Sequence, residues 1–192
     1  WDLAGAEFVT DIRPYEEMKL RLLNGAHSFL AYLGAVSGKA TISDCMDDEL
    51  FRAAVSRLML DEQMPTLNMP AQVDLNGYVD ALLARFSNSA LRHKPTQIAS
   101  DGSQKLPQRL LAPIQTHIAS GRDWPLSALA VAGWMAYCKG SSESGQPLPL
   151  VDPLAEQITK IATEFEGDQF VENMIGIGAI CDKGLVSSPR FV

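Results

Sequence analysis

The sequence predicts an all-α fold. Apolar residues recur at helical spacing in long stretches over most of the chain. Prolines, glycines and small polar clusters separate these stretches, as is typical of helix ends. The alternating pattern of a half-buried strand occurs only at 7–12, which is either one strand or a linker. We therefore expect a domain of antiparallel and crossing helices.

The first predicted element is one long helix that follows an extended lead-in at 2–12. It is expected to begin at Pro14, because proline is favoured in a first helical turn, and to run to about Val36. Gly25 and Gly34 lie inside it and each cost about 1 kcal/mol relative to alanine. We therefore expect this helix to pack closely against another helix or a ligand.

Most of the remaining chain is predicted to form helices with one apolar face. These are expected at 47–62, 74–86, 105–118, 126–138, 152–165, 169–174 and 177–183. Residues 41–44 are expected to form a turn and a helix cap. The helix at 126–138 is the most apolar and should be central, whereas Pro113 should kink or divide its own helix. A solvated loop is expected at 139–150, and 187–192 should be unstructured or a short strand.

Composition excludes several classes of protein. The 192 residues suit a single domain of ordinary size, with 46% apolar and 20% charged residues. A net charge of −7 argues against nucleic acid or an anionic membrane as the main partner. No apolar run is long enough to span a bilayer. The start has neither a basic signal-peptide region nor a methionine, so we expect a fragment or a processed product of a cytoplasmic protein.

Three cysteines, Cys45, Cys138 and Cys181, lie far apart in the sequence. Their number is odd, and their spacing matches no metal-binding motif. We therefore expect reduced, buried thiols and no metal.

Some motifs suggest functions that their context does not support. Gly176-Ile177-Gly178 suggests a dinucleotide fingerprint, but Cys181 stands at the third glycine position and no strand precedes it. A helix boundary is the ordinary interpretation. Ser87 and His93 have no evident triad partner. His117 is expected to be a surface or C-terminal histidine that the helix dipole favours.

Lys19, Asn24 and His27 are polar residues within an otherwise apolar helical pattern. On an ideal α-helix they would spread over about 140° and rise about 12 Å along the axis. This arrangement would suit one wall of a pocket for an elongated small molecule. Each residue alone also has an ordinary interpretation, as a solvated lysine, a capping asparagine or a core histidine.

Together these residue types can perform acid–base chemistry. Desolvation by Met18, Leu22 and Leu23 would lower the pKa of Lys19, which could then exchange a proton with an alcohol. The amide of Asn24 could donate to an oxygen that gains negative charge. A histidine can orient a substrate hydroxyl. Alcohol–ketone interconversion also needs a hydride, which a cofactor must supply.

A second polar patch spans 101–105, with Arg109 one turn later. It is either a turn and helix start with ordinary solvated charges, or a site in which Lys105 supplies a cation to a substrate.

Several long runs point to a known family. They are PYEEMKLRLLNGAHSFLAYLGAVSG from Pro14, and then RFSNSALRH, QIASDGSQKLPQRLL and LAVAGWMAYCKG. These runs resemble the C-terminal substrate domain of the mannitol dehydrogenase family, the polyol-specific long-chain dehydrogenases/reductases. The hallmark of the family is a lysine, an asparagine five residues later and a histidine three further, which correspond to Lys19, Asn24 and His27. The resemblance is weakest in the last forty or so residues.

The resemblance implies a fold and a set of roles. Residues 1–192 should form one helical domain like the C-terminal domains of the 6-phosphogluconate dehydrogenase superfamily, with 1–13 leading in from an N-terminal Rossmann domain. That domain should bind NAD or NADP. Lys19 should be the general acid/base, and Asn24 should form an oxyanion hole with a second asparagine from the other domain. His27 should orient the substrate, and Lys105 should contact it.

One position departs from the mannitol-oxidising members, which carry a substrate-contacting arginine eight residues before Lys105. Gln97 stands there and weakens mannitol itself as the substrate. The DGSQKLPQR run looks more like the hexuronate-reducing members, the fructuronate reductases (mannonate oxidoreductases). We therefore expect an NAD(P)-dependent oxidoreductase of hexuronate metabolism that interconverts fructuronate and mannonate, with this chain inactive alone.

The alternatives are of two classes. Within the enzymes, they are a mannitol or arabinitol 2-dehydrogenase, or a tagaturonate reductase. Outside them, the chain would be a stand-alone helical module that binds a sugar acid or a protein without catalysis.

Overall fold

The structure is a computed structural model that describes residue 3 and residues 8–191, and within this part it is helical. The α-helices are α1 (Arg13–Met18), α2 (Ala26–Val36), α3 (Ile42–Asp47), α4 (Glu49–Arg57), α5 (Leu75–Phe86), α6 (Pro95–Ile98), α7 (Gly102–Leu106), α8 (Ala112–Ser120), α9 (Pro125–Cys138), α10 (Ala155–Glu164), α11 (Gly167–Ile175) and α12 (Lys183–Val186). Three segments are wider π-helix, namely η2 (Lys19–Gly25), η3 (Leu58–Gln63) and η6 (Pro107–Leu111). Two are 3-10 turns, η4 (Met64–Thr66) and η5 (Ser89–Leu91). The all-α prediction is confirmed.

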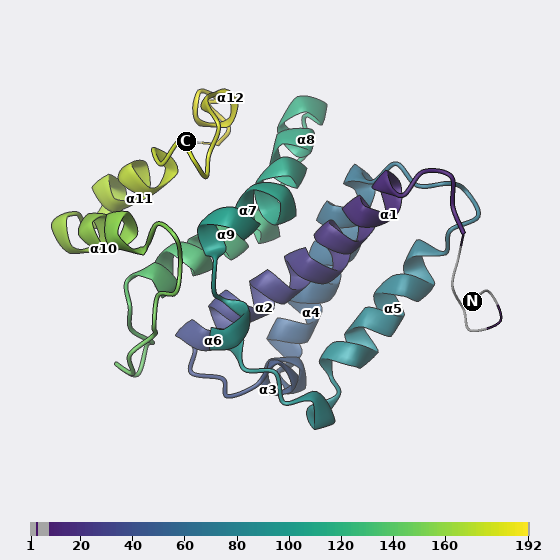
Figure 1. Ribbon diagram of the computed structural model, residues 1–192, viewed down its shortest axis with the longest axis horizontal. Coiled ribbons are helices and arrows are strands. Elements are labelled where there is room, and N and C mark those ends of the chain that lie inside the picture. The colour runs from purple at the N-terminus through teal and green to yellow at the C-terminus, as the bar shows by residue number, and fades with distance from the viewer. Residues whose placement is uncertain (1–2, 4–7, 192) are drawn as a thin grey trace.

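The long first helix is confirmed as well. α1, η2 and α2 follow one another without a break and form a single rod across the middle of the molecule (Figure 1). Both of its glycines pack closely, as expected. A Cβ on Gly25 would lie 3.0 Å from the carbonyl oxygen of Arg109, and one on Gly34 would lie 2.5 Å from Sγ of Cys45.

Pro113 does not divide its helix, because α7, η6 and α8 also run on without a break. Proline lacks an N–H and its ring clashes with the carbonyl four residues earlier, here that of Arg109. The wider π-turn of η6 precedes Pro113 and accommodates the ring. The carbonyl of Arg109 instead accepts a hydrogen bond from Nε2 of Gln63 at 3.4 Å.

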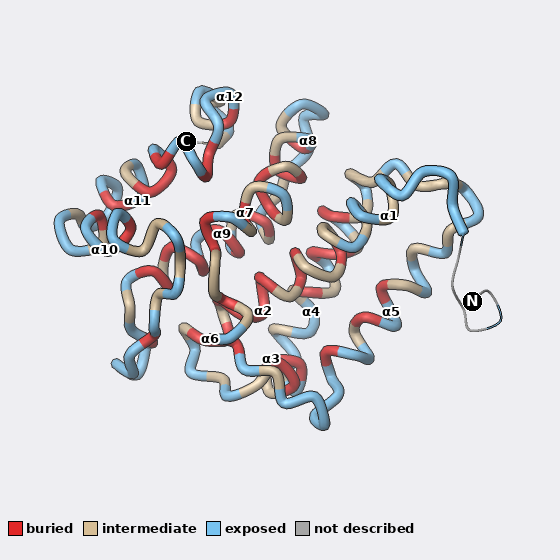
Figure 2. The backbone as a smooth tube through the Cα atoms, viewed as in Figure 1, coloured by how far each residue is buried: buried red, intermediate tan, exposed pale blue. Residues whose placement is uncertain are grey.

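The centre of the fold is the contact between α2 and α9. A Cβ on Gly133 of α9 would lie 2.7 Å from Leu33 of α2, so the two helices approach closely. Nearby, the rings of Tyr32 and Tyr137 lie 5.8 Å apart. Buried residues concentrate along α2, α7 and α9, whereas α5 and α10 expose their outer faces (Figure 2). The prediction that the helix at 126–138 is central is therefore confirmed.

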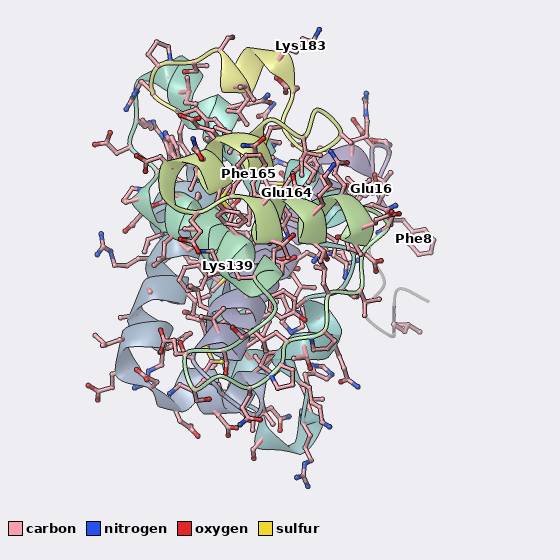
Figure 3. The ribbon with its side chains drawn as sticks, turned by 90° about the vertical axis from the view of Figure 1, so that its left-hand side faces the viewer. Phe8, Glu16, Lys139, Glu164, Phe165 and Lys183 are labelled. Atoms are coloured by element: carbon pink, nitrogen blue, oxygen red, sulfur yellow. The ribbon has the colours of Figure 1, made fainter. Side chains whose placement is uncertain are left out.

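The other helices lie around this centre, with α5 at one end of the molecule and α10 and α11 at the other (Figure 1). Figure 3 looks onto α10 and α11 and shows Lys139 at the end of α9 beneath them. The ammonium of Lys139 lies 4.9 Å from the centre of the Phe170 ring of α11.

Some local predictions are wrong. Residues 177–182 form turns rather than a helix, and α12 begins only at Lys183, with Asp182 accepting the N–H of Leu185 at 2.8 Å as its cap. Residues 41–44 do provide the expected cap on Thr41, but they lead into the unpredicted helix α3. Residues 8–12 are a linker rather than a strand, and Glu7 lies outside the described residues. Residues 187–191 are turns, and Val192 also lies outside the described part.

His117 lies in the last turn of α8, as expected, but it is buried rather than on the surface. Its Nε2 lies 2.6 Å from the carbonyl oxygen of Glu62. The carboxylate of Glu62 is buried too, and it accepts the backbone N–H groups of Leu126 at 2.8 Å and Ser127 at 2.7 Å. These contacts fix the N-terminus of α9 against η3. The three cysteines are buried and unpaired, as predicted.

Candidate active site

The π-helical segment η2 arranges the first two candidate residues. Lys19 is its first residue and Asn24 its sixth. A π-helix forms hydrogen bonds between residues five apart, so residues at this spacing stand close to one another on the same face. The wide spread expected for an ideal α-helix is therefore reduced. His27 follows in the first turn of α2, three residues after Asn24, where an α-helix keeps it on that face.

The position of η2 explains why the helix widens there. It packs against η3 and η6, the two other π-helical segments. Gly25 leaves room for the backbone of Arg109, because it has no side chain to separate η2 from η6 at this point. π-Helical turns are rare and are often found at functional sites.

Asn24 and His27 both have polar atoms that are buried without a partner, Oδ1 and Nε2 respectively. Burying a polar atom without a hydrogen bond costs about 1–3 kcal/mol. The other polar side-chain atom of each residue makes no hydrogen bond to the described part of the chain and is not enclosed. The amide N–H groups of Asn24 and Nδ1 of His27 are thus free to bind a ligand.

His27 lies in a basic and aromatic environment. Its ring lies 5.1 Å from that of Phe86 and 5.9 Å from that of His93. Burial, together with the charges of the nearby His93, Arg109, Arg85 and Lys105, lowers the pKa of His27 to about 4. His27 is therefore neutral at pH 7 and serves as a hydrogen-bonding group rather than as a cation.

Lys105 and Gln97 are linked through Ser100. The ammonium of Lys105 donates to Oγ of Ser100 at 3.2 Å and to the carbonyl of Ile98 at 3.3 Å, and the Ser100 hydroxyl donates to the carbonyl of Gln97 at 3.3 Å. Asp101 lies 3.8 Å from the same ammonium. Burial lowers the pKa of Lys105, and so does the charge of Arg109. The side chain of Gln97 is exposed.

The expected desolvation of Lys19 is wrong for this chain. Lys19 is exposed, and its ammonium makes no hydrogen bond or ion pair with any residue that the structure describes. A helix surrounded on one side by solvent leaves a long side chain free to extend away from Met18, Leu22 and Leu23. Lys19 can therefore meet a group that approaches from outside this domain.

Arg109 is the residue whose importance the sequence alone left open. Its guanidinium is half-buried beside His27 and donates to Oγ of Ser28 at 3.1 Å. The sequence indicated only a cation one turn after the 101–105 patch, because burial of its guanidinium depends on how η6 packs against α2.

The described residues do not provide a dinucleotide site. Gly176-Ile177-Gly178 lies in the turn after α11, and no strand precedes it in residues 8–191. The pyrophosphate fingerprint needs a strand, a glycine turn and a helix N-terminus together. The side chains brought together around Asn24 and His27 fit a polar small molecule instead. In the same described part, no helix is long and apolar enough to cross a membrane.

Comparison with known proteins identifies the family of the chain. The family described as the mannitol dehydrogenase C-terminal domain matches residues 11–192. The chain belongs to the mannitol dehydrogenase family. Within this family, it is 48% identical to the D-mannonate oxidoreductase of Escherichia coli over 192 residues, which cover 100% of this chain and 40% of that protein. It is 50% identical to the oxidoreductase YeiQ of the same organism, covering 100% of this chain and 39% of YeiQ.

The mannitol dehydrogenase fold is also evident in three dimensions. A structure of Pseudomonas fluorescens mannitol 2-dehydrogenase, in ternary complex with NAD and D-mannitol, superposes with a TM-score of 0.91 at 35% identity. The superposition covers 100% of this chain and 38% of that one. The chain thus spans about two fifths of the length of the relatives that it matches.

Proposed function

We propose that this chain is the substrate-binding part of an NAD(P)-dependent oxidoreductase that interconverts fructuronate and mannonate. The observation that carries the proposal is the alignment of Lys19 and Asn24 by η2, with His27 on the same face. This arrangement supports a site in which Lys19 is the acid, Asn24 the amide donor and His27 a neutral hydrogen-bonding group. Membership of the mannitol dehydrogenase family supports the reaction class.

In the direction of reduction, the substrate ketone oxygen lies between Lys19 and Asn24. The ammonium of Lys19 donates its proton to the alkoxide as it forms, and the Asn24 amide stabilises the developing negative charge. In the direction of oxidation, Lys19 takes the proton from the alcohol. The cofactor supplies or accepts the hydride, since no side chain can do so.

His27, Lys105 and Gln97 bind and orient the substrate. His27 is neutral at pH 7, so it can hydrogen-bond a hydroxyl through Nδ1 without adding a charge. Lys105 is held in place by Ser100 and Asp101, and its positive charge is close enough to His27 to contribute to the lowered pKa of that ring. Gln97 is exposed and could hydrogen-bond a further hydroxyl.

The basic groups around His27 favour an acidic substrate over a neutral polyol. The groups whose charges lower the pKa of His27 most, His93, Arg109, Arg85 and Lys105, are all basic, although the whole chain has a net charge of −7. A local excess of positive charge in an acidic protein attracts anions. A hexuronate carries one carboxylate, and mannitol carries none. The similarity to a D-mannonate oxidoreductase supports the same choice.

The cofactor would be held by an N-terminal Rossmann domain in the full-length protein. The mannitol 2-dehydrogenase structure that contains NAD supports this assignment, as does the fact that this chain covers only 38% of that protein. The lead-in to α1 exposes Phe8 by 81% and Ile12 by 57%, and Phe8 lies on the same side as Glu16 of α1 (Figure 3). Apolar exposure of this kind is typical of a surface that another domain covers.

A substrate panel on the full-length protein tests the proposal. Initial rates would be measured with fructuronate, tagaturonate, fructose and xylulose, each with NADH and with NADPH. We expect the highest kcat/KM with fructuronate. A preference for fructose would indicate a mannitol 2-dehydrogenase instead. No turnover with any of the four would favour a binding module without catalysis.

A further inference from the structure

Arg109 carries a positive charge that no carboxylate in the described part of the chain neutralises. Some cations in the described part pair with carboxylates, such as Lys39 with Asp48 at 2.9 Å and Arg190 with Asp123 at 2.9 Å, whereas exposed ones such as Lys19 rely on solvent. The half-buried guanidinium of Arg109 has no such partner among the described residues. Its one hydrogen bond, to the Ser28 hydroxyl, leaves four of the five N–H donors unused.

The environment of this guanidinium is costly for a charge. Its Nε is buried without a partner, and burial lowers the pKa of Arg109. A buried charge without a partner costs several kcal/mol, and proteins usually avoid it by pairing the charge. The hydroxyl of Tyr32, one turn after Ser28 on α2, is also buried and unpaired. The unsatisfied groups therefore lie together on the side of α2 that Arg109 faces.

The backbone of Arg109 is fixed in this position. Its carbonyl oxygen would be only 3.0 Å from a Cβ on Gly25, and it accepts a hydrogen bond from Gln63. Two neighbouring segments, η2 and η3, thus both contact the backbone carbonyl of residue 109. Binding sites gain affinity when the charged group is positioned in advance, because less entropy is lost when the ligand binds.

The spacing of the site fits the two ends of a sugar acid. Asn24 and Ser28 are four residues apart, which is about 6 Å along the helix axis. In fructuronate, the reacting C2 and the C6 carboxylate are separated by four carbon–carbon bonds, which span about 5 Å. His27 lies between the two positions, where it can reach an intervening hydroxyl. A ketone at Asn24 therefore places the carboxylate near Ser28 and the Arg109 guanidinium.

We propose that Arg109 binds the carboxylate of the substrate through its planar fork and so selects sugar acids over neutral ketoses. This inference rests on the proposed function, and it adds the residue that recognises the carboxylate group of the substrate. A guanidinium binds a carboxylate through two parallel hydrogen bonds, which a lysine cannot reproduce. The carboxylate also neutralises a charge that has no partner among residues 8–191.

The test compares fructuronate with fructose, which has a CH₂OH group in place of the carboxylate. Arg109→Met in the full-length enzyme keeps most of the volume of the side chain and removes the charge. We expect kcat/KM for fructuronate to fall roughly 10- to 100-fold, the scale of a lost charged hydrogen bond, mainly through KM. The kcat/KM for fructose should change less than about threefold. Arg109→Lys should give an intermediate loss with fructuronate.

Two further readouts distinguish binding from a structural role. Removing an uncompensated charge should leave Tm unchanged or higher in Arg109→Met. The Kd for NADH should also be unchanged. Arg52→Met is the matched control, because Arg52 lies on α4 and also makes one hydrogen bond to the chain, to the carbonyl of Met46 at 3.1 Å. It should leave the kcat/KM values for both sugars unaltered.

Several results would overturn the inference. One is an Arg109→Met enzyme that keeps the wild-type preference for fructuronate. Another is an equal loss with both sugars together with a lower Tm, which would indicate a structural role. A higher Kd for NADH would mean that the Arg109 guanidinium binds a phosphate of the cofactor. If Arg109→Met does not fold, full wild-type selectivity in Arg109→Lys overturns the inference as well. Failure of the proposed function itself would show in the wild-type enzyme, as a kcat/KM for fructuronate no higher than that for fructose.

Discussion

Acidification should destabilise the protein through His27. Its pKa lies at about 4 in the folded chain and at 6.5 when unperturbed, because burial and then the charges of His93 and Arg109 disfavour the protonated ring. Between these two pKa values the unfolded chain binds more protons than the folded one. The free energy of unfolding therefore falls as the pH falls below 6.5. Between pH 7.5 and pH 5, the shift corresponds to a loss of about 2 kcal/mol.

His27→Gln isolates this contribution, since glutamine keeps a hydrogen-bonding group and does not titrate. Urea unfolding of the full-length protein would be followed at pH 7.5 and at pH 5, for the wild type and for the variant. The wild type should lose about 2 kcal/mol more than the variant over this range. NMR of ring-labelled histidines gives the pKa directly, with the His27 signal identified by its absence in the variant.

Two results would refute the reasoning. The first is a His27 signal that titrates near 6.5, which would mean that the ring is neither desolvated nor close to positive charge. The second is an equal loss of stability in wild type and variant.

The other stability predictions concern the packing of α9. Glu62→Gln should destabilise by about 2–3 kcal/mol, because one of the N–H groups of Leu126 and Ser127 loses its acceptor and the helix N-terminus loses a negative charge. Urea unfolding measures this loss, and a change below about 0.5 kcal/mol would contradict it. Gly102→Ala should cost at least about 2 kcal/mol, since its Cβ would collide with Nε1 of Trp134. Gly178→Ala is the matched control, with nothing within 4 Å of its Cβ, and equal melting temperatures for the two variants would contradict the collision.

Much of the fold is predictable from the sequence because helical periodicity records which face of each segment is buried. The long helix from Pro14 to Val36 and the apolar helix at 126–138 both carry such a pattern, and both predictions are confirmed. Residues 177–182 form turns although a helix was predicted there, and Ile177, Ile180 and Cys181 are buried at helical spacing. Burial alone produces that pattern, and the cap on Asp182 starts the helix later.

The π-helical segments and the environment of Arg109 could not be predicted, because both depend on contacts between distant parts of the chain. η2 widens where it packs against η3 and η6, and the helix propensities of its own residues do not indicate contacts with these distant segments. Pro113 carries the usual signal of a helix break, and the distant side chain of Gln63 donates to the carbonyl that the proline cannot serve. Family resemblance indicated Lys19, Asn24 and His27 as the site. The chemical roles of these residues and of Lys105 and Gln97 stay predictions.

The central claim is that Lys19 transfers the proton. The most direct test is kcat for fructuronate reduction by the full-length Lys19→Ala enzyme, with Lys160→Ala as the control, since Lys160 lies exposed on α10. Loss of a general acid/base typically costs about 10²- to 10⁴-fold in rate. We expect kcat of Lys19→Ala to fall by at least about 100-fold while Lys160→Ala keeps the wild-type value. A kcat close to wild type in Lys19→Ala would contradict the account, because some other group would then be the acid.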